Sequence, residues 1–240
     1  MSFRAISEAI NTSTNSTTQE MTMNTHFNDL INNPSPRCPV ALVLDISGSM
    51  SGEPIEQLNV GAQLFIDEVK SDDLARWSVD LSVFAAGGEV ECLLDFTSVE
   101  QIGGIAPMDA CGTTPLGEAT RMALSRLEAR KAEYRHAGVP YYQPWLVIIS
   151  DGVPTDDWEE AARRACQLSA ERKLVSLPVG VSGANMQVLS AFSSKPAIGL
   201  HGLKFREFFL WLAASMARVS ASTSSDAAVQ LPSIDSWGSV

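Results

Sequence analysis

Two continuous apolar runs, each closely followed by an aspartate, constrain the fold of this chain more than any other feature. The first run spans residues 40–44 and precedes Asp45; the second spans residues 145–149 and precedes Ser150 and Asp151. Apolar runs of this length, without polar alternation, are typical of strands buried on both faces of a parallel sheet. Ligands of open parallel sheets bind beyond the carboxyl ends of the strands. We therefore expect the two aspartates to face one crevice.

The rest of the chain alternates strand and helix patterns. This alternation predicts the α/β class: a mostly parallel sheet with helices on both faces in three layers. The glycines after Ala86 predict a tight hairpin turn, which makes residues 90–96 an antiparallel edge strand. The other expected strands are 40–45, 77–84, 144–150, 173–179 and 197–201. The expected helices are 54–69, 115–135, 157–171, 184–192 and 204–219.

The segment after the first run has the composition of a site for a hard metal ion. Asp45 supplies a negative charge, Ser47 and Ser49 supply neutral oxygens, and Gly48 allows a sharp turn. Mg²⁺ prefers such oxygens at about 2.0–2.1 Å in an octahedron that keeps some water. The same residues also fit a strand-to-helix turn whose serines cap the next helix. Two later segments favour the metal, because Thr114 precedes a proline that can open a helix and Asp151 ends a second buried strand.

Taken together, these residues resemble the metal-ion-dependent adhesion site (MIDAS) of von Willebrand factor type A (vWA) domains. The resemblance covers roughly residues 38–220 and lies in Asp45-x-Ser47-x-Ser49, Thr114 and Asp151-Gly152. It implies a Rossmann-like three-layer sandwich and a bound Mg²⁺, with Mn²⁺ as an alternative. It also implies that Asp45, Ser47, Ser49 and Thr114 are ligands, with Asp151 acting directly or through water.

Thr113 competes with Thr114 for the ligand position. Thr114 stands three residues before Gly117, which is where the family motif places its ligand. Five further segments resemble the bacterial TerY-like branch, which is associated with tellurium resistance and stress operons. They are residues 52–59, 130–135, 140–145, 154–158 and 203–212.

The resemblance implies a protein interaction module in which the metal captures a Glu or Asp of a partner. In this family such capture often shifts the last helix, here residues 205–219. The TerY-like branch implies a Ser/Thr protein kinase and a metal-dependent protein phosphatase as partners, in a stress-response, tellurite-resistance or phage-defence module. The alternatives are an adaptor for an AAA+ ATPase and a structural subunit whose metal only stabilises the fold.

Composition narrows the classes of function. Seventeen basic against 28 acidic residues give a net charge of −11, which argues against nucleic acid as a partner. The four cysteines are scattered without a Cys-x-x-Cys pair, which predicts reduced and mostly buried thiols. No segment has the pattern of a membrane span or a signal peptide, so we expect a cytoplasmic protein with no membrane partner.

Enzymatic motifs are missing from the sequence. An aspartyl-phosphate phosphatase resembles Asp-x-Asp, but position 47 is serine. A serine hydrolase needs Gly-x-Ser-x-Gly and a histidine base, and neither nucleotide-binding glycine motif is present. We therefore expect no catalytic activity.

The two ends of the chain differ from the body. Residues 1–36 are expected to be a flexible N-terminal extension, in which Phe27, Leu30 and Ile31 share one helical face. Residues 37–220 are expected to be the domain. Residues 221–240 are expected to be a C-terminal tail, in which Trp237 clasps the domain or, as a second choice, binds a partner.

Three predictions near the site concern side-chain roles. Asp156 and Asp157 are expected to cap the helix that follows them. Glu53 and Asp109 are near the site in sequence and either influence metal affinity or only solvate the surface. The aromatic residues Tyr141, Tyr142 and Trp145 fit either an interface patch or a packed loop.

Overall fold

The computed structural model describes residues 30, 33, 35–151, 153–224 and 228–240. Its strands are β1 (Cys38–Asp45), β2 (Val79–Gly87), β3 (Glu89–Ser98), β4 (Trp145–Ser150), β5 (Val175–Gly180), β6 (Ile198–Leu200) and β7 (Gly238–Ser239). Its α-helices are α2 (Glu53–Ser71), α3 (Ala75–Ser78), α4 (Leu116–Ala137), α5 (Glu159–Ala170), α6 (Met186–Ser190) and α7 (Phe205–Ser220). Short 3-10 helices, η1 (Gly48–Met50) and η2 (Val99–Gln101), follow β1 and β3.

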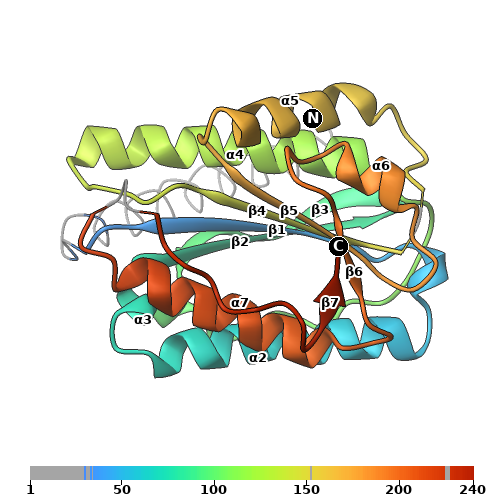
Figure 1. The fold of residues 1–240 in the computed structure, drawn as a ribbon, viewed down its shortest axis with the longest axis horizontal. Coiled ribbons are helices and arrows are strands. Elements are labelled where there is room, and N and C mark those ends of the chain that lie inside the picture. The colour runs from blue at the N-terminus through green and yellow to red at the C-terminus, as the bar shows by residue number, and fades with distance from the viewer. Residues whose placement is uncertain (1–29, 31–32, 34, 152, 225–227) are drawn as a thin grey trace, which may run out of the picture.

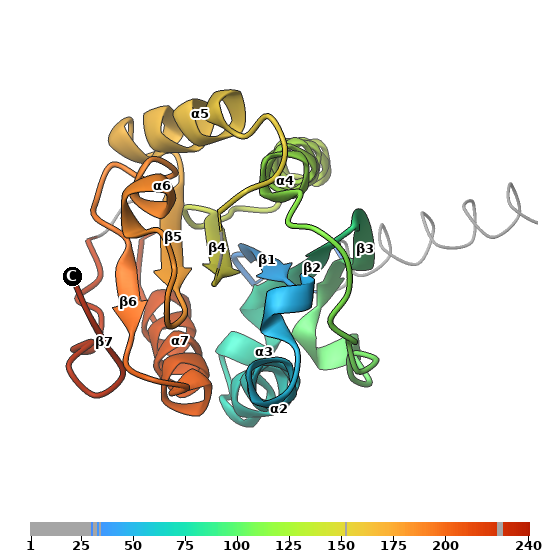
Figure 2. The same ribbon diagram turned by 90° about the vertical axis from the view of Figure 1, so that its right-hand side faces the viewer.

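The strands form one sheet in the order β3-β2-β1-β4-β5-β6-β7. Helices α4, α5 and α6 cover one face of the sheet, and α2, α3 and α7 cover the other (Figure 1, Figure 2). The predicted α/β sandwich is thus confirmed. The five strands from β2 to β6 in this order are parallel, and β3 is the expected antiparallel edge. A second antiparallel strand, β7, was not predicted; it pairs through two residues only, which leaves no periodicity to read.

Strand order reverses beside β1, and this reversal positions the site. The chain passes from β1 to β2 on one side and later returns to β4 on the other side. Such a switch point opens a crevice at the carboxyl ends of the two central strands. Asp45 is the last residue of β1 and Ser150 the last residue of β4, so both lie at that edge.

The core has two layers because both faces of the sheet are covered. Val40, Leu42 and Leu44 of β1 face the layer of α2 and α7, whereas Ala41 and Val43 face the layer of α4 and α5. The expected apolar faces of the helices at 54–69 and 204–219 are buried. Met122 of α4 is one of the few large apolar side chains that are exposed.

The strand that was predicted at 77–84 starts at Val79 in the structure, two residues later than expected. Trp77 belongs to α3 and is 44 % exposed. The carboxylate of Asp72 accepts hydrogen bonds from the backbone N–H groups of Leu74 and Ala75, at 3.0 and 2.8 Å. This side-chain cap stabilises a helical turn and overrides the strand preference of the tryptophan.

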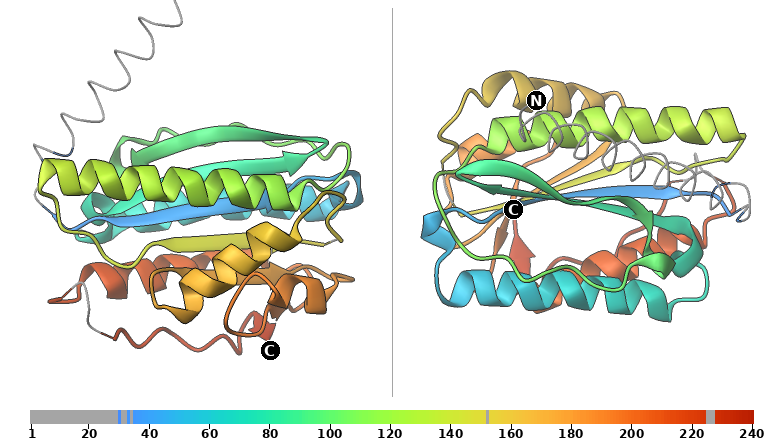
Figure 3. Two further views of the ribbon diagram at one scale, coloured as in Figure 1. Left: turned by 90° about the horizontal axis from the view of Figure 1, so that it is seen from above. Right: turned by 180° about the vertical axis from the view of Figure 1, so that it is seen from behind.

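The C-terminal tail clasps the domain as expected. Trp237 is fully buried, and its ring lies 4.9 Å from that of Phe208 and 5.2 Å from that of Trp211. The indole N–H of Trp211 donates to the carbonyl of Pro232 at 2.9 Å. The tail therefore runs along α7 and ends on the edge of β6 (Figure 3).

Of the expected N-terminal helical face, only Leu30 belongs to the described part of the chain. It is buried against Tyr134 and Val139, while Phe27 and Ile31 lie outside the described residues. None of the described helices combines the length and the hydropathy that crossing a bilayer requires. All four cysteines are free thiols, but only Cys38 is buried, which corrects the expectation that most of them are.

Candidate metal centre

The carboxylate of Asp45 is held rigidly at the end of β1. It is fully buried, and its two oxygens accept different hydrogen bonds. Oδ1 accepts the backbone N–H of Ser47 at 2.9 Å, and Oδ2 accepts the hydroxyl of Ser150 at 2.5 Å. Each carboxylate oxygen has a further lone pair, so these contacts orient the group without using up its capacity to bind a cation.

The hydroxyls of Ser47 and Ser49 connect the end of β1 to Asp151. Their Oγ atoms are 3.0 Å apart, and Ser49 Oγ donates to Asp151 Oδ1 at 2.9 Å. Adjacent ligands of an octahedral ion bound at about 2.1 Å are about 3.0 Å apart. These two hydrogen-bonded spacings are compatible with neighbouring positions around Mg²⁺.

Thr114 is brought to the same edge by its backbone. The N–H of Gly48 donates to the carbonyl of Gly112 at 3.0 Å, and the N–H of Cys111 donates to the carbonyl of Ile46 at 2.7 Å. Gly112 has φ of 66°, and a Cβ there would lie 2.5 Å from Cα of Gly88, so only glycine fits. Thr114 itself is 5 % exposed.

The loop between β4 and α5 holds Thr114 in position through Thr155. Thr114 accepts the backbone N–H of Thr155 at 2.9 Å and donates its own N–H to Thr155 Oγ1 at 3.1 Å. The structure thus joins Asp45, Ser47, Ser49 and Asp151 by hydrogen bonds. The loop that carries Thr114 contacts the end of β1 through Cys111 and Gly112.

The electrostatics of the edge favour a cation. Burial raises the pKa of Asp151; the hydrogen bond from Ser49 lowers it in part, and the charge of Asp45 raises it again. The net effect on this pKa is upward. A positive ion between the two carboxylates would remove both the desolvation penalty and their mutual repulsion.

The donor set fits a hard divalent cation. It consists of two carboxylates and three hydroxyls, all of them oxygen ligands of the kind that Mg²⁺ and Mn²⁺ prefer. Within the described ranges, no group of three or more His, Cys, Asp or Glu side chains is placed to bind a metal. The candidate site therefore differs from a cluster of acids in drawing three of its five donors from hydroxyl groups.

Two residues of this region were missed or misassigned from the sequence. Ser150 was not expected to hold Asp45, although the parallel pairing of Leu44 with Ile149 places the next two residues side by side. Asp156 was expected to cap α5, which was wrong. Its carboxylate instead accepts the N–H groups of Gly117 and Glu118, at 3.0 and 2.7 Å, and so caps α4. This cap fixes the helix that follows Thr114.

Trp158, which precedes α5, and the aromatic residues at the start of β4, the opposite end of that strand from Ser150, serve packing. Trp158 stacks on Phe192 with ring centroids 5.8 Å apart. Tyr142 and Trp145 are buried, which favours the packed loop over the interface patch. Glu53 and Asp109 are exposed on the segments that flank the site.

Comparisons with known proteins agree with this geometry. A model of the von Willebrand factor type A domain matches residues 40–209. No curated protein matches. Among solved structures, the pilus adhesin SpaC of Lactobacillus rhamnosus GG in its open conformation is similar, with a TM-score of 0.62 and 12 % identity over 77 % of this chain and 30 % of that one.

Two other structures are similar at comparable levels. The ArnB paralog VWA2 of Sulfolobus acidocaldarius has a TM-score of 0.51 and 17 % identity, over 75 % of this chain and 45 % of that one. Proximal thread matrix protein 1 of the mussel byssus, with zinc in its MIDAS motif, has a TM-score of 0.51 and 15 % identity, over 75 % and 46 %. This chain spans less than half the length of each of these three proteins.

The family match covers well over half of the chain and includes the end of β1, the loop of Thr114 and the end of β4. The solved structures share the fold of the sheet and its helices. The chain belongs to the von Willebrand factor type A domain family.

Proposed function

We propose that this protein is a Mg²⁺-dependent protein interaction module, and that its metal captures a Glu or Asp side chain of a partner. The observation that carries the proposal is the oxygen array of Ser47, Ser49 and Asp151 beside the buried Asp45, with spacings of 3.0 and 2.9 Å. The zinc-occupied MIDAS motif of the mussel protein supports a divalent ion at such an edge. Mn²⁺ is an alternative occupant.

The ligand count explains why an anion is attracted. Asp45, Ser47, Ser49 and Thr114 supply about four of the six positions of an octahedral ion. Asp151 then acts directly or through a bound water. The remaining one or two positions belong to water until a carboxylate displaces it, and the ion keeps a positive charge because three of its four protein ligands are neutral.

The protein residues have separate tasks in this scheme. Asp45 is the charged anchor, oriented by Ser150 and by the backbone of Ser47. Thr155 and Asp156 hold the loop of Thr114 and the start of α4. This scheme needs no catalytic residue, and we assign none.

Metal titration tests the first half of the proposal. Asp45→Ala should abolish binding of Mg²⁺ and Mn²⁺ in calorimetry, because it removes the buried charge. The matched control is Asp73→Ala, which removes an exposed acid beyond the far end of α2. Equal affinities for wild type and Asp45→Ala would contradict the metal assignment.

Partner capture tests the second half. Affinity capture in Mg²⁺ should retain a protein on wild type that is lost with Asp45→Ala and with chelation. Retention by both forms would move the interface away from the metal. If chelation lowers the melting temperature but leaves capture unchanged, the structural-subunit alternative is correct, through ordinary ligand linkage.

The cellular setting is a further part of the proposal. From the resemblance to TerY-like proteins we infer that this module works in the cytoplasm of a bacterium, in a stress-response, tellurite-resistance or phage-defence system with a Ser/Thr kinase and a metal-dependent phosphatase. An AAA+ ATPase is the alternative partner. The identity of the captured protein distinguishes these settings.

A further inference from the structure

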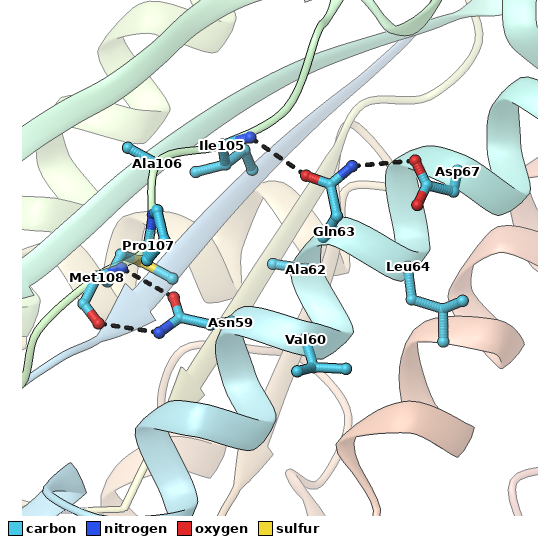
Figure 4. Close-up of a pocket in the computed structure, with 10 residues that line it drawn as sticks. All are labelled: Asn59, Val60, Ala62, Gln63, Leu64, Asp67, Ile105, Ala106, Pro107 and Met108. Atoms are coloured by element: carbon cyan, nitrogen blue, oxygen red, sulfur yellow. Dashed lines mark hydrogen bonds between the residues drawn. The ribbon is translucent and has the colours of Figure 1, made fainter.

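A groove separates α2 from the segment that leads to the metal loop. It has a volume of about 470 Å³ and is open to solvent on one side (Figure 4). Volumes of about 300–1,000 Å³ are typical of pockets that hold small ligands or side chains. Its apolar lining comes from both walls: Val60, Ala62, Leu64, Ile105, Ala106 and Pro107.

The two walls of the groove, α2 and residues 105–108, are joined by hydrogen bonds of side-chain amides. Asn59 donates its Nδ2 to the carbonyl of Met108 and accepts the N–H of Met108 on Oδ1, both at 2.9 Å. Gln63 accepts the N–H of Ile105 at 3.4 Å and donates to Asp67 Oδ1 at 2.9 Å (Figure 4). The groove is therefore preformed, which reduces the ordering cost of binding.

These hydrogen bonds also determine which chemical groups a bound molecule would contact. The side-chain amides of Asn59 and Gln63 already have hydrogen-bond partners, so the lining offers mainly carbon atoms. Val60, which lines the groove, is 60 % exposed. Covering it would remove apolar surface from water.

The charge on the groove is negative. Asp67 is its only charged lining residue among those described, and its carboxylate is exposed. Glu56 and Glu68 are exposed on the same helix, whereas Lys70 donates its ammonium group to the carbonyl of Ile102. A cationic group next to an apolar one complements this surface.

We propose that this groove docks a segment of a partner protein that carries a large aliphatic side chain beside lysine or arginine. The aliphatic side chain packs on the apolar residues of the lining, and the cation pairs with Asp67. A second copy of this chain is a poor occupant, because a net charge of −11 makes two copies repel each other.

Both walls continue into the metal centre. Helix α2 starts at Glu53, shortly after Ser49, and the other wall runs on to Thr114. At a rise of about 1.5 Å per residue, Asn59 lies only about 9 Å along the axis from the start of the helix. One partner would therefore place its acid on the metal and its basic, apolar stretch in the groove; this last step rests on the proposed function.

Peptide probes test the groove on the full-length protein. Isotope-labelled protein would be titrated with the blocked tetrapeptides Leu-Lys-Leu-Lys, Leu-Glu-Leu-Glu and Gly-Lys-Gly-Lys, with amide shifts as the readout. We expect saturable shifts at Val60, Leu64 and Ile105 with the first peptide only. The binding should weaken as salt rises from about 50 to 500 mM, since solvent ions screen an exposed pair.

Matched variants locate the site. Asp67→Asn keeps an oxygen for Gln63 but removes the charge, and it should weaken binding about threefold to fivefold, as expected for an exposed ion pair. Val60→Ser should weaken it by at least about threefold, because it removes exposed apolar surface from the contact. The controls Asp73→Asn and Leu74→Ser change exposed residues outside the groove and should bind as wild type.

Several results would overturn the proposal. These are shifts spread over the whole surface, equal binding of the acidic peptide, or unchanged binding by the two groove variants. Groove shifts that depend on protein concentration without peptide would identify a second copy as the occupant. Binding of the first peptide should persist in chelator and in Asp45→Ala, so a failure of the metal hypothesis would leave this result intact.

Discussion

Replacing Asp80 with asparagine should destabilise the fold strongly without affecting the metal centre. Asp80 is fully buried near the start of β2. Its Oδ2 accepts the Tyr134 hydroxyl at 2.6 Å and two N–H groups of Arg130 at 2.7 and 3.1 Å. Its Oδ1 accepts a guanidinium N–H of Arg37 at 3.3 Å. Asparagine fits the same space but removes the countercharge that Arg37 and Arg130 share; Arg130 keeps its second ion pair, with Glu133.

The expected loss follows from this burial. Removing one partner of a buried ion pair costs about 3–5 kcal/mol. For a domain of this size, each kcal/mol shifts the melting temperature by about 2–4 °C, so the decrease should be about 6–20 °C. Chemical denaturation and thermal melts measure both quantities. Metal affinity should be unchanged, because Asp80 pairs with Pro39 at the opposite end of β1 from Asp45.

A surface ion pair provides the matched control. Arg76 and Glu100 form a two-pronged contact at 2.8 Å in which both side chains are partly exposed. Glu100→Gln should cause a much smaller loss of stability, because solvent screens this pair. If Asp80→Asn and Glu100→Gln lowered stability by similar small amounts, the buried network would not stabilise the domain as reasoned here.

Two further predictions concern the metal edge and the tail. In chelator, Asp151→Asn should stabilise the protein increasingly as pH rises above about 4, the ordinary pKa of aspartate, because the pKa of Asp151 is raised and its ionisation opposes folding. With Mg²⁺ the same variant should bind the ion less tightly. Denaturation at several pH values, with and without metal, measures both effects. Trp237→Ala should lower the free energy of unfolding by up to about 3–5 kcal/mol, the usual range for a buried tryptophan, and should speed hydrogen exchange in β6. The indole N–H of Trp237 has no hydrogen-bond partner among the described residues, so Trp237→Phe should retain most of this stability.

Local sequence patterns were sufficient for most of the fold. The apolar run of β1 and the 3.6-residue periodicity of α2 and α7 depend on burial, which leaves a direct trace in the order of residues. The error at Trp77 arose where a capping aspartate competed with strand preference. The two-residue strand β7 was missed because its pairing depends on the burial of Trp237 rather than on its own composition.

The identity of the candidate ligands could also be read from the sequence, because a hard metal needs particular oxygen donors at the ends of strands. The contacts that hold these donors in position could not be read from it. Ser150 meets Asp45 only through the register of β1 and β4, and Asp156 caps α4 rather than the helix beside it. Such partners are chosen by the packing of distant segments.

The sequence by itself determined the class of fold, the order of its elements and the chemistry of the candidate metal ligands, because each follows from local periodicity or from residue type. Only the tertiary structure decided which segments meet. It produced the buried charges around Asp80, the tail on α7 and the groove between α2 and Ile105. These features join residues far apart in the chain, and their contacts depend on how complete helices and strands pack against one another.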